Sequence, residues 1–253
     1  MTGIEQLYIL GLLPSKKLYA DKKALAEVQR LERVSLNLNP SVWNKTDPDV
    51  LKIAFLNANS IKEKFSWIKS DYHLQKAEVI CLSETWLEVT DPGFSLSLPG
   101  FKLSLCNVGR GQGIATYHRE EGFFTLEKSF KSSRVNIIKV TSDQLDIISI
   151  YRSSDGDLET LVEQMRSLIS QDKNCVVGGD MNLNLLESEN NIFTQFMKSK
   201  GFQQLVKLST HIGGGLLDHC YVKIDRGNVY VELCPKVCSD HDAISVCYHQ
   251  IAM

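Results

Sequence analysis

Hydrophobic and polar positions in the N-terminal part of the chain follow a helical pattern that then stops. Apolar residues recur at helical spacing over about 21–35, with charged residues between them, which predicts a helix with its apolar positions at Leu25, Val28, Leu31 and Val34. The next stretch, NLNPSVWNKTDPDV, is rich in Asn, Pro and Asp and is typical of a linker. We therefore expect an N-terminal extension over residues 1–50 and a main domain over residues 51–253.

In the main domain, short apolar runs alternate with amphipathic segments. Runs bounded by turn residues predict strands, and these runs are LKIAFLN (51–57), AEVICLSE (77–84), FKLSL (101–105), GIATYH (113–118), FFTLEKSF (123–130), NIIKVTS (136–142), LDIISIYR (145–152), CVVGGD (175–180), LLDHCYVK (216–223), NVYVELC (228–234) and DAISVCYHQ (242–250). Helices are predicted in KEKFSWIKSDYHL (62–74), over about 157–170 and over about 190–200.

The order of these elements predicts the fold class. The strands between 100 and 152 are separated by turns, as in hairpins or an antiparallel meander, whereas helices separate other strands. Both mixed and antiparallel pairing follow, so a doubly wound parallel sheet does not fit. We expect an α/β fold of four layers, an α/β sandwich in which two mixed β-sheets pack face to face with helices outside.

The composition is ordinary for a soluble globular protein, with 43% hydrophobic and 23% charged residues. No apolar run approaches the roughly 20 residues that span a bilayer, and LYILGLLP (7–14) is a poor secretory signal because it follows Glu5 rather than a basic segment. Most of the 7 cysteines lie in apolar runs, where free thiols pack as small hydrophobic groups. We expect a nuclear or cytoplasmic protein without membrane contact, disulfide framework or zinc site.

The formal net charge of −2 changes the expected relation to nucleic acid. Proteins that rely on long-range attraction to DNA are usually basic, so this charge counts against a protein that coats DNA. It is compatible with an enzyme that holds a few phosphates in one cleft with the help of a metal ion.

Polar side chains stand at the ends of the predicted strands, where a rigid scaffold displays chemical groups. Carboxylates and amides are suited to a hard cation such as Mg²⁺, and a His beside a carboxylate is suited to acid-base or electrostatic work at a phosphate. The chain contains neither G-x-x-x-x-G-K-[ST] nor G-x-S-x-G. Metal-assisted phosphodiester hydrolysis fits best. The side chains concerned are Asn57, Asn59, Glu84, Tyr151, Asp180, Asn182, Asp218, Ser239, Asp240 and His241.

The motifs at these strand ends occur in the order found in a known superfamily. They are LNANSI (56–61), LSETWL (82–87), SIYRSSDG (149–156), VGGDMNLN (177–184), LLDHCYV (216–222) and SDHDAI (239–244). In this order they resemble the endonuclease/exonuclease/phosphatase superfamily, which includes abasic-site endonucleases and the endonuclease domains of non-LTR retrotransposons. The resemblance covers about 51–250.

The mobile-element branch is more similar than the repair branch. SETWL, IYRSS and THIGGGLLDHCYV resemble mobile-element endonucleases, and residues 3–31 resemble the tail of the helicase carried by Helitron-type transposons. The resemblance implies DNA as the substrate and a helicase, or another protein of the element, as a candidate partner. An ordinary N-terminal helix that packs on the domain is the alternative for residues 3–31.

The resemblance also implies a metal site. Glu84 would be the principal ligand of Mg²⁺, or of Mn²⁺ in its place, with Asp240 and the Asn57/Asn59 pair in or near the same shell. Asn59 stands where repair enzymes commonly carry a second acidic residue, so this metal shell is expected to be poorer in charge.

Further residues would act on the phosphate. His241, oriented by Asp218, would sit on it, and Asp180 would orient or deprotonate the attacking water. Asn182 and Tyr151 would donate hydrogen bonds to its oxygens in the transition state.

The resemblance places Thr210, Asn59 and Ser239 along the substrate site. His219 is expected to be a structural histidine, because its side chain alternates away from that of Asp218 along a strand. Arg152, Ser153 and Ser154 replace the Pro or Asn that relatives often carry, which leaves the rigidity of that loop in question.

The leading hypothesis is a Mg²⁺-dependent DNA endonuclease of mobile-element origin that leaves 3′-hydroxyl and 5′-phosphate ends. A repair endonuclease for abasic sites and a phosphodiesterase or phosphatase acting on a small or lipid substrate are alternatives within the enzyme class. A non-catalytic DNA-binding remnant is the alternative outside it, and the intact set of polar residues argues against this one.

Overall fold

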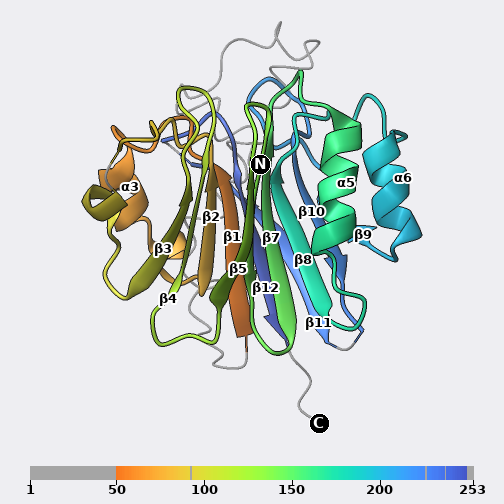
Figure 1. Cartoon of the computed structure of the whole chain (residues 1–253), viewed down its shortest axis with the longest axis horizontal. Helices are drawn as coiled ribbons and strands as arrows, with labels where there is room; N and C mark the ends of the chain where they lie inside the picture. The colour runs from red at the N-terminus through yellow and green to blue at the C-terminus, as the bar shows by residue number, and fades with distance from the viewer. Residues whose placement is uncertain (1–49, 92, 226, 237, 250–253) are drawn as a thin grey trace, which may run out of the picture.

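The computed structural model of the protein describes residues 50–91, 93–225, 227–236 and 238–249. Within these residues the chain forms two six-stranded sheets that pack face to face (Figure 1). The helix predicted over 21–35 and the helicase-like segment 3–31 lie outside the described residues. No helix of the described part is long and apolar enough to cross a bilayer.

The first sheet has the strand order β11-β12-β1-β2-β4-β3. Among its described strands β1 and β2 pair in parallel and the other neighbours are antiparallel, so the sheet is mixed. Its strands are β1 (Val50–Asn57), β2 (Val79–Ser83), β3 (Phe101–Cys106), β4 (Ile114–Arg119), β11 (Asn228–Cys234) and β12 (Ala243–His249).

The second sheet has the order β5-β6-β7-β8-β10-β9 and repeats this arrangement, with β7 and β8 as its parallel pair. Its strands are β5 (Thr125–Lys131), β6 (Val135–Thr141), β7 (Leu145–Arg152), β8 (Asn174–Asp180), β9 (Gln203–Gln204) and β10 (Asp218–Lys223). The four-layered sandwich of two mixed sheets is therefore confirmed.

Helices cover the outer faces of both sheets. Because side chains alternate along a strand, each sheet buries one face against its partner and the other beneath helices. Figure 1 shows α3 (Phe65–Ser70) on one side of the sheets, and α5 (Leu158–Leu168) and α6 (Ile192–Ser199) on the other. Buried apolar side chains of α5 and α6 pack in one cluster with the outer face of the second sheet.

The single helix predicted over 62–74 is two short helices, α3 and α4 (Tyr72–Gln75). They are separated at Asp71, whose carboxylate accepts hydrogen bonds from the backbone N–H groups of His73 and Leu74 at 3.0 Å. This is the capping role that Asp plays at a helix start, so it begins a new helix there. The pattern also missed β9 and a 3₁₀ turn at Gly93–Leu96, which are too short to show periodicity.

Candidate active site

The candidate site lies where the two sheets approach each other closely. Gly178 on β8 faces the ring of Phe55 on β1, and a Cβ atom at position 178 would come within 2.7 Å of that ring. Two residues further along each strand, on the same faces, Asn57 Nδ2 donates to Asp180 Oδ2 at 2.9 Å. Gly179 has a φ of +127° and would clash with the Ile150 carbonyl if it carried a Cβ. The two glycines thus join Asn57 and Asp180 across the sandwich.

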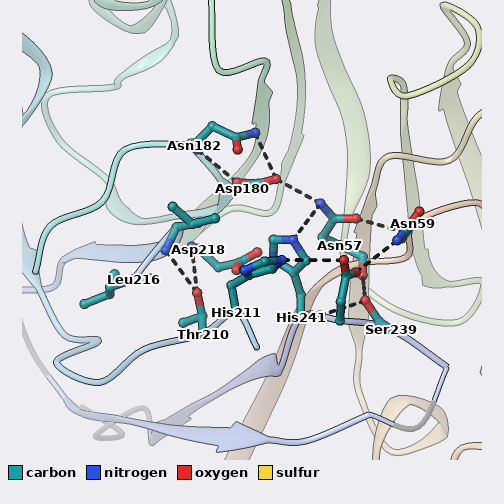
Figure 2. A network of polar contacts seen from close by, with 12 residues as sticks. Asn57, Asn59, Asp180, Asn182, Thr210, His211, Leu216, Asp218, Ser239 and His241 are labelled. Atoms are coloured by element: carbon teal, nitrogen blue, oxygen red, sulfur yellow. Dashed lines mark hydrogen bonds and ion pairs between the residues drawn. The ribbon is translucent and has the colours of Figure 1, made fainter. Parts of the chain in front are cut away.

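A buried histidine–carboxylate pair lies beside this junction. Asp218 begins β10 directly opposite Asp180 in the antiparallel register, and its Oδ2 lies 2.7 Å from Nδ1 of His241 (Figure 2). Burial lowers the pKa of His241, but the carboxylates of Asp218 and Asp180 outweigh it and raise this pKa to about 10. His241 is therefore an imidazolium at neutral pH, and its Nε2, which lies 3.4 Å from Asn57 Nδ2, also carries an N–H.

Asp180 has an unusual acidity for a carboxyl group. Burial, followed by the neighbouring charge of Asp218, raises its pKa to about 8, although the backbone N–H of Asn182, at 2.9 Å, and the charge of His241 act in the opposite direction. A carboxyl group with a pKa near neutrality can exchange a proton with water under physiological conditions.

The loops after β1 and before β12 are tied together. Ser239 Oγ donates to the carbonyl of Asn57 at 2.6 Å and accepts from the backbone N–H of His241 at 3.0 Å. Asn59 Nδ2 donates to Asp240 Oδ1 at 3.0 Å. Asn59 and Ser239 thus position the segment that carries Asp240 and His241.

Thr210 fixes the backbone at Asp218. Its Oγ1 accepts hydrogen bonds from the backbone N–H groups of Leu217 and Asp218 at 3.1 and 3.0 Å, and the residue is 1% exposed. In the structure its hydroxyl oxygen accepts from these two backbone groups, and the place along the substrate site that the resemblance implies for Thr210 stays a prediction.

Glu84 and Tyr151 reach the site from opposite sheets. Burial is the main cause that raises the pKa of Tyr151, and the charges of Glu84 and Asp180 raise it further, which places all three groups in one neighbourhood. The Tyr151 hydroxyl donates to the carbonyl of Gly111 at 2.8 Å. Glu84 Oε2 accepts from Trp86 Nε1 at 3.3 Å.

Arg152 makes the loop after β7 rigid. Its guanidinium donates to the carbonyls of Gly156, Met181, Ser154 and Asn182 over 2.7–3.2 Å, and the side chain of Asn182 donates back to the Arg152 carbonyl at 2.9 Å. Asn182 also donates to Asp180 Oδ2 at 3.2 Å. The arginine that departs from the pattern of relatives therefore supplies the rigidity that the sequence left in question.

His211 is a residue of the site that sequence reasoning missed. It forms a β-bridge with His241, and the two ring centroids lie 4.7 Å apart. Its Nδ1 accepts from the backbone N–H of Gly213 at 3.0 Å, so the neutral ring carries its proton on Nε2, which lies 3.5 Å from Asp240 Oδ2. The contact with His211 is the main cause that lowers the pKa of Asp240. In the sequence, the position of His211 next to Thr210 and just before the run of three glycines was the feature that could have drawn attention to it.

His219 lies away from this network, as its place on β10 predicted. Its Nε2 bonds to the Leu183 carbonyl at 2.9 Å and its Nδ1 to the Tyr221 hydroxyl at 3.2 Å. Burial lowers its pKa to about 4. His219 is a neutral structural histidine.

The donor set fits a hard divalent cation. Asp180, Asp218 and His241 place potential ligand atoms within 4.8 Å of one another, and so do His211, Asp240 and His241. The imidazolium of His241, shared by both groups, has no lone pair free for a metal. In the second group the proton on Nε2 of His211 blocks the lone pair that a metal would need. Carboxylate and amide oxygens therefore remain the suitable donors for such a cation.

No protein-family model and no curated protein matches the sequence. Among solved structures, the chain is similar to an AP endonuclease from Archaeoglobus fulgidus, with 17% identity, a TM-score of 0.58 and coverage of 78% of this chain and 99% of that one. It is similar to the endonuclease domain of TRAS1, a telomere-specific non-LTR retrotransposon, with 12% identity, a TM-score of 0.59 and coverage of 79% of this chain and 99% of that one. A third similar structure is a 3′-5′ exonuclease from Neisseria meningitidis, with 14% identity, a TM-score of 0.58 and coverage of 78% of this chain and 98% of that one. At these identities the similarity shows a shared fold.

Proposed function

We propose, from the premise that the chain has the endonuclease/exonuclease/phosphatase fold, that it is a Mg²⁺-dependent DNA endonuclease. It would hydrolyse one phosphodiester bond of a duplex and leave 3′-hydroxyl and 5′-phosphate ends. The observation that carries this proposal is the buried Asp218–His241 pair, with Nδ1 and Oδ2 2.7 Å apart, beside a carboxyl group of raised pKa.

The two groups have complementary tasks at a phosphate. His241, protonated at neutral pH, donates Nε2–H to a phosphate oxygen and offsets the charge that grows there in the transition state. Asp180 in its ionised form accepts a proton from the attacking water, and the leaving 3′ oxygen takes up a proton from solvent; with a pKa of about 8, this carboxylate is a stronger base than an ordinary one. Asn182, held against Asp180, orients that carboxyl group.

Glu84 and Asp240 are the proposed metal ligands, with the Asn57/Asn59 pair in or near the same shell. When bound, the cation supplies Lewis-acid stabilisation of the scissile phosphate and of the leaving 3′ oxygen. Asn59 and His211 hold the Asp240 carboxylate from its two oxygens, at 3.0 and 3.5 Å. This arrangement leaves Asp240 ionised and fixed in place.

DNA as the substrate is supported by the kinds of protein that share the fold. One solved neighbour is an AP endonuclease and another is the endonuclease domain of a retrotransposon. We propose that this chain likewise acts on DNA and derives from a mobile element, which agrees with the motifs SETWL and THIGGGLLDHCYV. A helicase encoded by the same element is the proposed partner of the N-terminal extension.

The test is nicking of supercoiled plasmid with Mg²⁺, with an EDTA control and with His241→Ala and Glu84→Ala variants. The proposal predicts conversion to open circles by the wild type alone, and only when Mg²⁺ is present. A duplex with one abasic site is assayed in parallel. Cleavage restricted to that duplex would replace the general endonuclease with a repair-type enzyme, and cleavage of neither by folded protein would overturn the proposal.

A further inference from the structure

Two neighbouring residues at the site have backbone conformations that L side chains rarely adopt. Glu84 has a φ of 49° and Trp86 a φ of 58°. For a bulky residue such as Trp this conformation is an outlier, and it persists only where the surroundings enforce it. The strained segment lies directly after β2 and includes the proposed principal metal ligand.

The surroundings that enforce it belong to the loop 107–113. The backbone N–H of Trp86 donates to the Gln112 carbonyl at 2.9 Å, and that of Thr85 to the Gly113 carbonyl at 3.4 Å. Gly113 has a φ of +95°, and a Cβ there would lie 2.5 Å from Thr85 Oγ1. From the opposite sheet, the Tyr151 hydroxyl bonds to the Gly111 carbonyl at 2.8 Å. The loop is thereby fixed to the site from both sheets.

The fixed position of the loop 107–113 places Arg110 beside the site. Its guanidinium carbon lies 5.5 Å from the centre of the Trp86 ring, within the range of a cation–π contact. The same indole donates through Nε1 to Glu84, so one side chain connects the arginine with the proposed metal ligand. Arg110 is exposed, and no carboxylate among the described residues forms an ion pair with it. Its charge is available to an anion from outside.

We propose that Arg110, held by Trp86, binds a backbone phosphate of the DNA strand next to the scissile phosphate. Arginine is suited to this task because its planar fork can donate two parallel hydrogen bonds to phosphate oxygens. The indole limits the positions that the guanidinium samples, so that less freedom is lost when the phosphate binds. The strained turn at 84–86 is what brings the indole and the carboxylate of Glu84 together.

This inference rests on the proposed function and makes it more specific. A phosphate contact outside the cleavage position requires a substrate with at least one further nucleotide. Arg110 therefore selects a polynucleotide over a small phosphodiester, although the groups around His241 act on the scissile phosphate alone.

The experiment measures binding rather than cleavage, so that its failure is distinguishable from failure of the proposed function. The dissociation constant of a fluorescent duplex is determined by anisotropy in EDTA over a series of salt concentrations. The proteins are the wild type, Arg110→Ala, Trp86→Asn and the double variant. Asn is chosen at 86 because it tolerates a positive φ. Arg166→Ala is the matched control, since Arg166 lies 5.1 Å from the Phe196 ring on the outer helices.

Arg110→Ala is expected to weaken binding by about tenfold at low salt and to reduce the salt slope by about one. Trp86→Asn should weaken it less, and the double variant no more than Arg110→Ala, because both changes remove one contact. Arg166→Ala should bind as the wild type does. Unchanged affinity and slope in Arg110→Ala would overturn the proposal, as would a wild type that does not bind the duplex at low salt. Additive losses in the double variant would overturn the role of Trp86.

Discussion

His241 Nδ1 and Asp218 Oδ2 lie 2.7 Å apart between the two sheets, and both side chains are buried. His241 precedes β12 of the first sheet, whereas Asp218 begins β10 of the second. The pair therefore exists only when the sheets are packed against each other. The sequence contains two Asp-His dipeptides, Asp218-His219 and Asp240-His241. His241 joins the buried pair with Asp218, whereas His219 points to the other face of its sheet.

Replacing Asp218 with Asn should lower hydrolysis of DNA by a factor of about 100 or more. The change removes the carboxylate that counteracts burial and raises the pKa of His241. The measurement is the single-turnover rate of plasmid nicking at neutral pH. His249→Gln, at the opposite end of β12, is the matched control and should keep the wild-type rate. Equal rates for Asp218→Asn and the wild type would contradict the role assigned to the pair.

Thr210→Val should destabilise the protein and slow hydrolysis, whereas Thr210→Ser should keep the wild-type stability and rate. Valine leaves the backbone N–H groups of Leu217 and Asp218 without their acceptor, and each unsatisfied buried donor costs about 1–3 kcal/mol. Urea denaturation gives the free energy of unfolding, and nicking well below the unfolding midpoint gives the rate. A serine variant as impaired as the valine variant would show that the methyl group matters rather than the hydroxyl.

His211→Leu should reduce hydrolysis more than His211→Gln does. Leucine removes the Nε2–H that faces Asp240 at 3.5 Å, while glutamine can still offer an N–H donor there. Because Asp240 is a proposed metal ligand, the loss should include a higher Mg²⁺ concentration for half-maximal activity. A Mg²⁺ titration of both variants checks this. If both require the same Mg²⁺ concentration as the wild type, His211 does not position Asp240.

The lowered pKa of His219 predicts that the protein loses stability in mild acid. Its pKa is lowered to about 4 in the folded protein from an ordinary 6.5, so between these values the unfolded chain binds a proton that the folded protein does not. Stability from this group is complete above about pH 6.5 and falls as the pH drops towards 4, by about 3 kcal/mol. Urea denaturation at several pH values, with His219→Gln alongside, measures it. Parallel pH profiles for the two proteins would contradict the prediction.

Periodicity predicted the large elements because they are long enough to repeat. Each of the eleven runs predicted as a strand overlaps a strand of the described structure, and β7 matches its predicted range of 145–152. The split at Asp71 escaped this reasoning because a capping carboxylate interrupts a helix without changing the apolar spacing. β9 has only two residues and is defined by pairing with β10 rather than by its own sequence.

The residues of the candidate site could be chosen from the sequence by residue type at strand ends, but their hydrogen-bond partners could not. The sequence could not show that the Thr210 hydroxyl accepts from the backbone N–H of Asp218, or that the Tyr151 hydroxyl donates to the Gly111 carbonyl; the places of both residues near the substrate stay predictions. Hydrogen-bond partners of this kind depend on how two sheets approach each other. His211 was missed for the same reason, since its proximity to His241 follows from a β-bridge between separate segments.

The most direct test of the central claim is whether the site cuts DNA and leaves the proposed ends. Supercoiled plasmid is nicked with wild-type protein and Mg²⁺, the protein is removed, and DNA ligase is added. Glu84→Ala and His241→Ala are carried through as controls. We predict that the wild type alone produces open circles and that ligase reseals them, because ligase requires a 3′-hydroxyl and a 5′-phosphate. Open circles that resist resealing, or nicking that persists in both variants, would contradict the account.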